Sequence, residues 1–262
     1  MEINFSKFKL QWPRSVYEGI DMLKVIEHIQ RHSRQSLLSF DGRNQPKIDK
    51  ATITVILAIC DRSCYAFSTK LLALNIVEAC YELIDPRDSK QLLLLTVIGV
   101  MLASKIYEQM IFGFDSIHFL TNHLFTNPTL YQWEIKVLEH LQFELFDNPR
   151  FVYRSHVLEY LYIIKSMSSD IKFPFFQRTT ELLFEIFLTN IDLIKEPIND
   201  DLLSLAMIQS ALVILTQHRG RFPLTWRLQN LTLVEEDQIF NLSSKILKIC
   251  VTKEFLDKLN MG

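Results

Sequence analysis

The segment from Asp88 to Glu108 constrains the fold most strongly, because it contains a long run of residues that is apolar on every side. Between Leu92 and Ala103 the only polar side chain is that of Thr96. A helix that is apolar all round has to be surrounded by other elements. The run is too short to cross a bilayer, which needs about 20 apolar residues, and Lys90 and Lys105 flank it. We therefore expect a buried central helix with Asp88 as its N-cap.

The composition supports a helical protein with large cores. Of 262 residues 48% are hydrophobic, and the chain has 19 Phe but only 6 Gly and 8 Pro, so it is rich in core-forming residues and poor in turn-forming ones. The formal net charge of -2 provides no basic field for nucleic acid and no polybasic stretch for a membrane surface. We therefore expect no direct nucleic-acid partner and no membrane partner.

The cysteines and histidines do not form a recognisable metal site. The N-terminus lacks a signal-peptide pattern, so we expect a reducing compartment and no disulfides. Cys60 and Cys64 are spaced to share a helix face, but no second pair completes a site, and we interpret them as small core residues. His28 and His32 have the same spacing, but Ile29 occupies the position where a zinc-protease motif has Glu. We expect no metal and no cofactor.

The sequence also argues against an enzyme. The few glycines form no Gly-rich phosphate loop, and no catalytic loop of the protein-kinase type is present. No Ser, His and Asp residues stand in a nucleophile-elbow pattern. We therefore expect no catalytic residues.

Apolar periodicity and cap residues divide the chain into two sets of helices. After an arm at 1–14, the first set is expected at residues 15–34, 49–64, 68–83, 88–108, 115–125 and 127–143, the last of these with Asn127 as cap and Pro128 as first helical residue. The turn-forming residues Asp147, Asn148 and Pro149 then mark a domain boundary. The second set is expected at residues 151–167, 175–194, 199–218, 223–229 and 234–251.

The two halves resemble each other when they are aligned at Leu92 and Leu202. In this register Leu92, Leu95, Ile98 and Leu102 coincide with Leu202, Leu205, Ile208 and Leu212, which indicates two copies of one helical domain. The copies differ in charge. Lys105 lies opposite Leu215 and Glu134 lies opposite Ser244, so any role of these two charged residues belongs to the first copy.

Four short segments in consistent order resemble the cyclin family. They are Leu102-Ala103-Ser104-Lys105 at the end of the central helix, Leu72-Ala73-Leu74-Asn75 in the helix before it, Trp133-Glu134 with Val137-Leu138, and Leu141-Gln142-Phe143-Glu144-Leu145. The resemblance implies an all-α fold of two tandem five-helix cyclin-box domains with an extra N-terminal helix. The domains would be residues 1–47 (arm and helix), 48–147 (first box) and 148–262 (second, divergent box).

The resemblance also implies a binding site. In cyclins, the Lys that closes the third helix and a Glu in the fifth grip the backbone around the regulatory helix of a cyclin-dependent kinase. Matched by position these are Lys105 and Glu134, with Ile106 and Phe112 as apolar neighbours in the kinase-partner interface. Charge-assisted hydrogen bonds are about twice as strong as neutral ones. The alternative is a partly exposed ion pair that contributes about 0 to 1 kcal/mol to stability and has no partner.

One cyclin feature is missing. Cyclins open their first helix with Met-Arg-Ala-Ile-Leu and a nearby Trp, which form a groove for substrate docking motifs. Here the segment reads Ile48-Asp49-Lys50-Ala51-Thr52, Val55 occupies the Trp position, and Glu78 replaces the Asp that pairs with the Arg and would face Asp49. The resemblance does not extend to this groove.

These departures, with Ile194-Lys195-Glu196-Pro197 and the stretch around Trp226, look most like the meiotic cyclin N-terminal domain-containing branch, whose members promote crossover formation. That resemblance implies a kinase regulator in the nucleus, in chromosome-associated foci, with meiotic recombination proteins as further partners. An alternative is a kinase-independent cyclin-fold adaptor that bridges other recombination or cell-cycle proteins. A DNA-bound cyclin fold would need a basic face, and the scattered His218, Arg219, Arg221 and Arg227 are too few for one.

Overall fold

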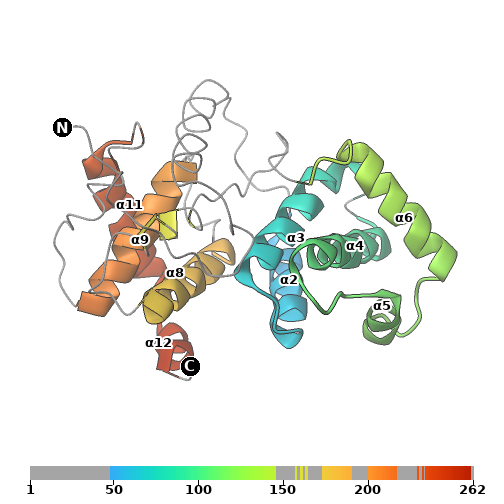
Figure 1. Cartoon of the computed structure of the whole chain (residues 1–262), viewed down its shortest axis with the longest axis horizontal. Coiled ribbons are helices and arrows are strands. Elements are labelled where there is room, and N and C mark those ends of the chain that lie inside the picture. Colours follow the sequence, from blue (N-terminus) through green and yellow to red (C-terminus); the bar gives the residue numbers. More distant parts are fainter. Residues whose placement is uncertain are drawn as a thin grey trace. The chain divides into compact units, whose positions relative to one another are not determined.

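A computed structural model describes residues 48–85, 87–145, 173–190, 200–216 and 234–260, together with residues 157, 160, 161, 163, 164, 229 and 232. Within these residues every regular element is a helix, as the sequence predicted (Figure 1). The chain divides into two compact units, of which one is Asn44–Arg154 and the other contains Ser155–Gly262. The expected helix at 15–34, most of those at 151–167 and 223–229, and the expected boundary at 147/148 lie outside the described residues.

The first unit consists of helices packed around one central helix (Figure 1). In chain order they are α2 (Lys50–Arg62), α3 (Phe67–Ala79), the short 3₁₀ helix η2 (Tyr81–Leu83), α4 (Ser89–Tyr107), α5 (Phe114–Leu120) and α6 (Asn127–His140). Helix α4 packs against α2, α3 and α6. All residues from Leu94 to Ser104 are buried, which confirms the prediction of a buried central helix.

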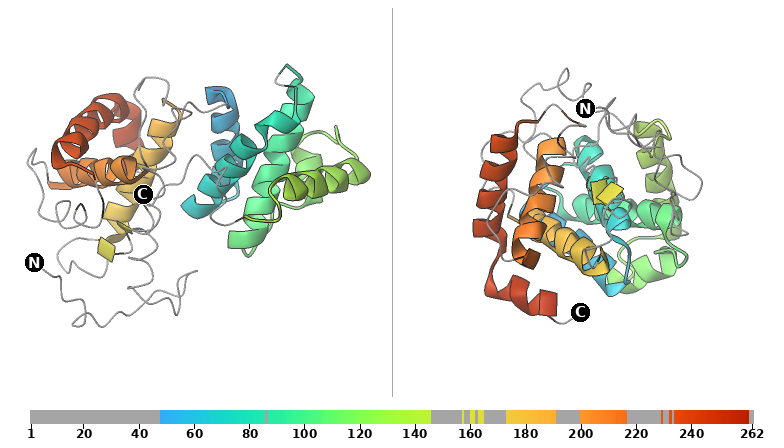
Figure 2. Two further views of the ribbon diagram at one scale, coloured as in Figure 1. Left: turned by 90° about the horizontal axis from the view of Figure 1, so that it is seen from above. Right: turned by 60° about the vertical axis from the view of Figure 1, so that its left-hand side comes forward.

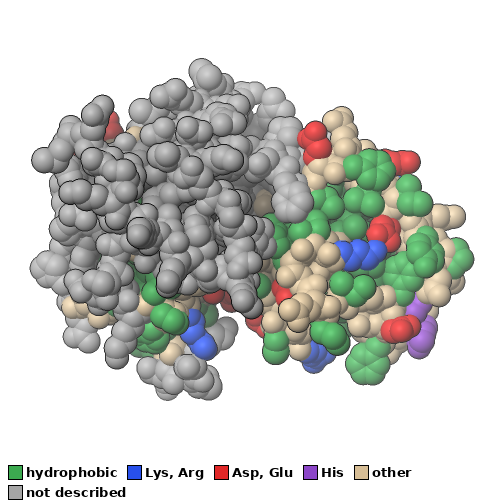
Figure 3. Space-filling view, viewed as in Figure 1, with side chains coloured by type: hydrophobic (Ala, Val, Ile, Leu, Met, Phe, Trp, Pro, Cys, Tyr) green, Lys and Arg blue, Asp and Glu red, His purple; other side chains and the backbone are tan. Residues whose placement is uncertain are grey.

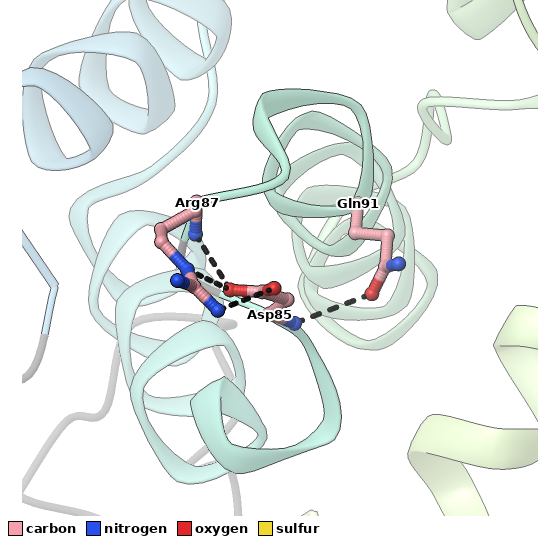
Figure 4. Close-up of polar contacts among 3 residues, drawn as sticks. All are labelled: Asp85, Arg87 and Gln91. Atoms are coloured by element: carbon pink, nitrogen blue, oxygen red, sulfur yellow. Dashed lines mark hydrogen bonds and ion pairs between the residues drawn. The ribbon is translucent and has the colours of Figure 1, made fainter.

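Helix α4 begins at the residue that the sequence predicted. Asp88 is its N-cap, and the Asp88 Oδ1 atom accepts hydrogen bonds from the backbone N–H groups of Lys90 (2.9 Å) and Gln91 (3.2 Å). In the turn before it, the Asp85 Oδ1 atom accepts two hydrogen bonds from Arg87, one from the backbone N–H (3.0 Å) and one from Nε (3.2 Å). The backbone N–H of Asp85 donates a hydrogen bond to Gln91 Oε1 (Figure 4). The Arg87 backbone hydrogen bond, followed by its side-chain bonds, lowers the pKa of Asp85.

Helix α3 is a second core helix that the sequence did not single out. Its residues from Thr69 to Ala79 are all buried, and it packs closely along α4. A Cβ atom on Gly99 of α4 would approach Val77 Cγ2 to 2.6 Å, so glycine is required for this close approach. The buried charges of α3 have partners, since Lys70 pairs with Asp61 and Glu78 Oε2 accepts a hydrogen bond from the Ile48 N–H (3.1 Å).

Among the described residues, α4 is the one helix that is long and apolar enough to cross a membrane by length and composition. Other helices of the first unit pack around it, and 61% of its apolar window is buried. The hydrophobicity of α4 is therefore explained by its place in the core.

The second unit contains α8 (Phe173–Leu188), α9 (Asp200–Thr216), α11 (Glu236–Cys250) and α12 (Lys253–Asn260). Helix α9 lies between α8 and α11 (Figure 2, right). Its predicted equivalence to α4 is reflected in burial. Leu205, Ile208 and Leu212 are buried as Leu95, Ile98 and Leu102 are, whereas Leu202 and Leu92 are both only half-buried. Two copies of one domain remain a prediction, which this correspondence supports.

Three details of the predicted helices are wrong. Thr126, not Asn127, is the N-cap of α6, because the Thr126 side chain accepts the Thr129 N–H, whereas Asn127 Oδ1 contacts His118 Nε2 at 2.6 Å. The helix predicted over 68–83 ends at Ala79 and continues as η2. Helix α12 was not predicted, because its 8 residues are fewer than the window of about 11 to 18 residues in which apolar periodicity is usually recognised.

The cysteines do not all behave as expected. All four are free, and Cys60, Cys80 and Cys250 are buried, which raises the pKa of the Cys250 thiol to about 12. Cys64 is exposed, so its predicted place in the core beside Cys60 is wrong. The reason is that α2 ends at Arg62 and Cys64 adopts a left-handed conformation (φ 55°) in the turn that follows.

Candidate partner-binding site

The structure brings together the two charged residues that the sequence singled out. Lys105 lies in the last turn of α4 and Glu134 in the middle of α6, and the Lys105 Nζ atom is 2.5 Å from Glu134 Oε1. The two helices pack against each other through their apolar sides, which include the fully buried Leu130 and Val137 of α6. Helix packing therefore fixes the backbones from which both charged side chains extend.

The ion pair lies at the surface of the first unit. The Lys105 side chain is 37% exposed and that of Glu134 is 16% exposed. A lysine ammonium has further donors and a carboxylate further acceptor sites beyond one mutual bond. The pair can therefore donate and accept hydrogen bonds toward the backbone of another protein without being broken.

The loop that follows Lys105 is hydrogen-bonded to a buried residue of α4. Ser104 is fully buried, and its Oγ atom donates to the Met101 carbonyl (2.8 Å) and accepts the Phe112 N–H (2.9 Å). The Phe112 side chain is only 5% exposed, so little of its area remains for a partner, and its main contribution is to hold this loop in place. Ile106 is half-buried and does retain area that a partner could cover.

Four large hydrophobic side chains that sequence reasoning did not assign to the site lie near these residues in the chain. They flank the end of α4 or belong to α6 and the turn after it, and they are Met110 (81% exposed), Ile111 (53%), Ile135 (54%) and Phe143 (67%). Figure 3 shows hydrophobic side chains gathered over α4 and α6 with few charged ones among them. The sequence did contain a signal for three of them. Met110, Ile111 and Phe143 follow the ends of helices, where core packing does not require hydrophobic residues.

Phe143 has an unusual backbone conformation. Phe143 (φ 60°) and Gln142 (φ 55°) are both left-handed, and the Phe143 N–H donates to the Leu138 carbonyl (2.8 Å). Bulky residues rarely adopt this conformation. This backbone conformation ends α6, and the Phe143 side chain is exposed directly after the helix.

The start of α2 holds the residues at which the sequence departs from cyclins. Asp49 caps α2 by accepting the Thr52 N–H (2.8 Å), a hydrogen bond that lowers the pKa of Asp49, whereas the buried Glu78 accepts the Ile48 N–H. Each carboxylate therefore has its own backbone donor. Val55 is 41% exposed and leaves no large aromatic ring at its position.

No set of three or more His, Cys, Asp and Glu side chains is placed to hold a metal ion in the part of the chain that the structure describes. The site defined by Lys105 and Glu134 is a partly exposed ion pair, with exposed hydrophobic side chains near it in the chain.

Comparisons with known proteins define the class of fold. The structure is similar to the crystal structure of a viral cyclin from herpesvirus saimiri, with a TM-score of 0.58 and 17% sequence identity over 90% of this chain and 97% of that chain. The chain therefore has a cyclin fold, in which the regular elements of the described residues are all helices. Its residues 19–146 match the family model described as the cyclin N-terminal domain, a span that includes Lys105 and Glu134. A search of curated proteins found no match.

Proposed function

We propose that this chain is a cyclin-like regulatory subunit that binds a cyclin-dependent kinase and is not itself an enzyme. The observation that carries the proposal is the contact between Lys105 and Glu134 at the surface of the domain that matches the cyclin N-terminal family. In the predicted alignment of the two halves, the matching positions hold Leu215 and Ser244, which cannot form such a pair. The charged pair is therefore not a general requirement of packing these helices.

The exposed hydrophobic residues fit this role. Ile135 directly follows Glu134, and Met110, Ile111 and Phe143 extend the apolar area at the ends of α4 and α6. Interfaces combine such apolar area with a few buried polar contacts. The partner helix would pack on this area while Lys105 and Glu134 bond its flanking backbone, which would hold the kinase with its own Lys–Glu pair closed.

Replacing Glu134 with alanine tests the proposal. The purified chain should retain a cyclin-dependent kinase from a panel of such kinases, and Glu134→Ala should reduce that retention at least about 30-fold in affinity, because Lys105 then loses the acceptor that orients it. Ser244→Ala is the matched control, since Ser244 aligns with Glu134 in the second unit, and it should bind as wild type does. Both variants should keep the wild-type melting temperature.

The competing function is a kinase-independent adaptor. If the wild-type chain retained no cyclin-dependent kinase, or if Glu134→Ala retained as much as wild type, the adaptor would be the surviving explanation. In that case the hydrophobic residues Ile135 and Phe143 would contact another class of protein.

We further propose a nuclear role in designating or maturing meiotic crossovers, with meiotic recombination proteins as additional partners. This narrower proposal rests on the resemblance of 194–197 and the Trp226 stretch to the meiotic branch. Tagged protein should form a few chromosome-associated foci per nucleus in meiotic prophase. A diffuse cytoplasmic signal at that stage would contradict it.

A further inference from the structure

Helix α3 begins without a capping side chain of its own. Its N-cap residue is Ala66, which has no side-chain acceptor for the free N–H groups of the first turn. The carboxylate of Glu108, at the end of α4, instead binds the N–H of the N-cap residue itself and a side chain of the first turn. Glu108 Oε1 accepts the Ala66 N–H (2.8 Å) and also the hydroxyl of the buried Thr69. A negative charge at this position also suits the N-terminal end of the helix dipole.

Glu108 is at the same time the C-cap of α4. Its N–H donates to the Ser104 carbonyl (2.9 Å), which closes the last turn of α4. One residue therefore links the end of α4 to the start of α3. Lys105 lies in this turn, between the buried Ser104 on one side and the anchored Glu108 on the other.

The two bonds of Glu108 hold the last turn of α4 from outside the helix. They join this turn to the Ala66 backbone and to the Thr69 hydroxyl at the start of α3, in addition to the turn's own backbone bonds. Helix ends that lack such contacts open readily.

We propose that Glu108 is a positioning residue for Lys105, which keeps the last turn of α4 closed so that the Lys105 ammonium is presented beside Glu134. This inference rests on the proposed kinase binding for its functional consequence, but the position of Lys105 can be measured without a kinase. An open turn would carry Lys105 away from Glu134. If the unanchored turn were closed about one tenth of the time, affinity for the partner would fall about 10-fold, because only the closed form binds.

Three variants separate positioning from other roles in a titration with the kinase that the wild-type chain retains. Glu108→Ala removes the acceptor and should bind about 10-fold more weakly. Glu108→Gln keeps a side-chain oxygen for Ala66 and Thr69 and should restore binding to within about 3-fold of wild type. Asp88→Ala, the matched control, removes the capping carboxylate at the opposite end of the same helix and should leave the affinity unchanged.

The outcomes that would overturn the proposal are distinct. Wild-type affinity in Glu108→Ala would show that the bonds of Glu108 are not needed for binding. If Asp88→Ala weakened binding equally, the effect of Glu108 would be a general loss of helix stability and not the positioning of Lys105. Glu108→Gln as weak as Glu108→Ala would show that binding depends on the charge of Glu108 and not on the hydrogen bonds that anchor the turn. Should Glu108→Ala fail to fold, Thr69→Val removes one of the two bonds to Glu108 and should give a smaller loss, whereas full affinity in that variant would again contradict the proposal.

A kinase-free measurement distinguishes failure of this inference from failure of the proposed function. The ammonium signal of Lys105 in the free chain can be followed by NMR, assigned by its loss in Lys105→Ala, and compared with its position in Glu134→Ala. Glu108→Ala should move the signal toward that of Glu134→Ala, and Glu108→Gln should return it. An unmoved signal in Glu108→Ala would overturn the positioning role whether or not a kinase binds.

Discussion

Replacing Ile98 with aspartate is expected to unfold the first unit or to lower its melting temperature severely. Ile98 is fully buried in the middle of α4. Burying an unpaired carboxylate costs several kcal/mol, which is comparable to the total stability of a domain, about 5 to 15 kcal/mol. The side chain has little room to escape, because α3 packs so closely on α4 that even a methyl group on the neighbouring Gly99 would clash with Val77.

Thermal melting followed by circular dichroism measures this effect. Lys90→Asp is the matched control, since it introduces the same side chain into the exposed first turn of the same helix, where a negative charge is favourable. That control should melt within a few degrees of wild type. If Ile98→Asp also melted with wild type, α4 would not be the core of the unit and the architecture described above would be wrong.

The central helix could be predicted because its signal is local. An uninterrupted apolar run has one stable environment, and Asp88 marks its start by a bond that is made within the next turn. Burial of α3 could not be predicted in the same way, because Lys70, Asn75 and Glu78 look like surface residues in the sequence. Their burial depends on tertiary contacts such as that of Lys70 with Asp61, which no periodicity encodes.

The candidate site, too, could be predicted from the sequence only in part. Resemblance of short segments to cyclins indicated Lys105 and Glu134, and the structure places their side chains in contact. Composition and spacing alone gave no reason to pair them. Phe112 was expected at the interface because it is a large apolar residue near Lys105. It is only 5% exposed in the structure, and its contact with a partner stays a prediction.

The role of Glu108 could not be read from the sequence at all. Its partners Ala66 and Thr69 are about 40 residues away in the chain and become neighbours only because α3 packs along α4. A capping residue is normally sought within a few positions of the helix start, and Ala66 offers no such signal. Other contacts that join the ends of packed helices are equally invisible in the sequence, because their partners lie far apart in the chain.

Reversing the charge of Lys105 should weaken partner binding about 30-fold or more and leave the fold intact. Lys105→Glu places a second carboxylate beside Glu134, but Lys105 is 37% exposed, and a partly exposed pair contributes only about 0 to 1 kcal/mol to stability. In the complex the same residue would be covered. Losing one member of a buried charge contact costs about 2 to 5 kcal/mol of binding, which is about 30-fold or more in affinity.

The double reversal Lys105→Glu with Glu134→Lys separates the two roles of the pair. It can rebuild the ion pair within the chain, so its melting temperature should equal that of wild type. It also exchanges the donor and the acceptor that face the partner backbone, so kinase affinity should remain as low as in Lys105→Glu. Lys90→Glu, an exposed charge reversal at the other end of α4, should bind as wild type does. Recovery of kinase binding by the double reversal would mean that the pair acts only on the fold, and would remove Lys105 and Glu134 from the interface.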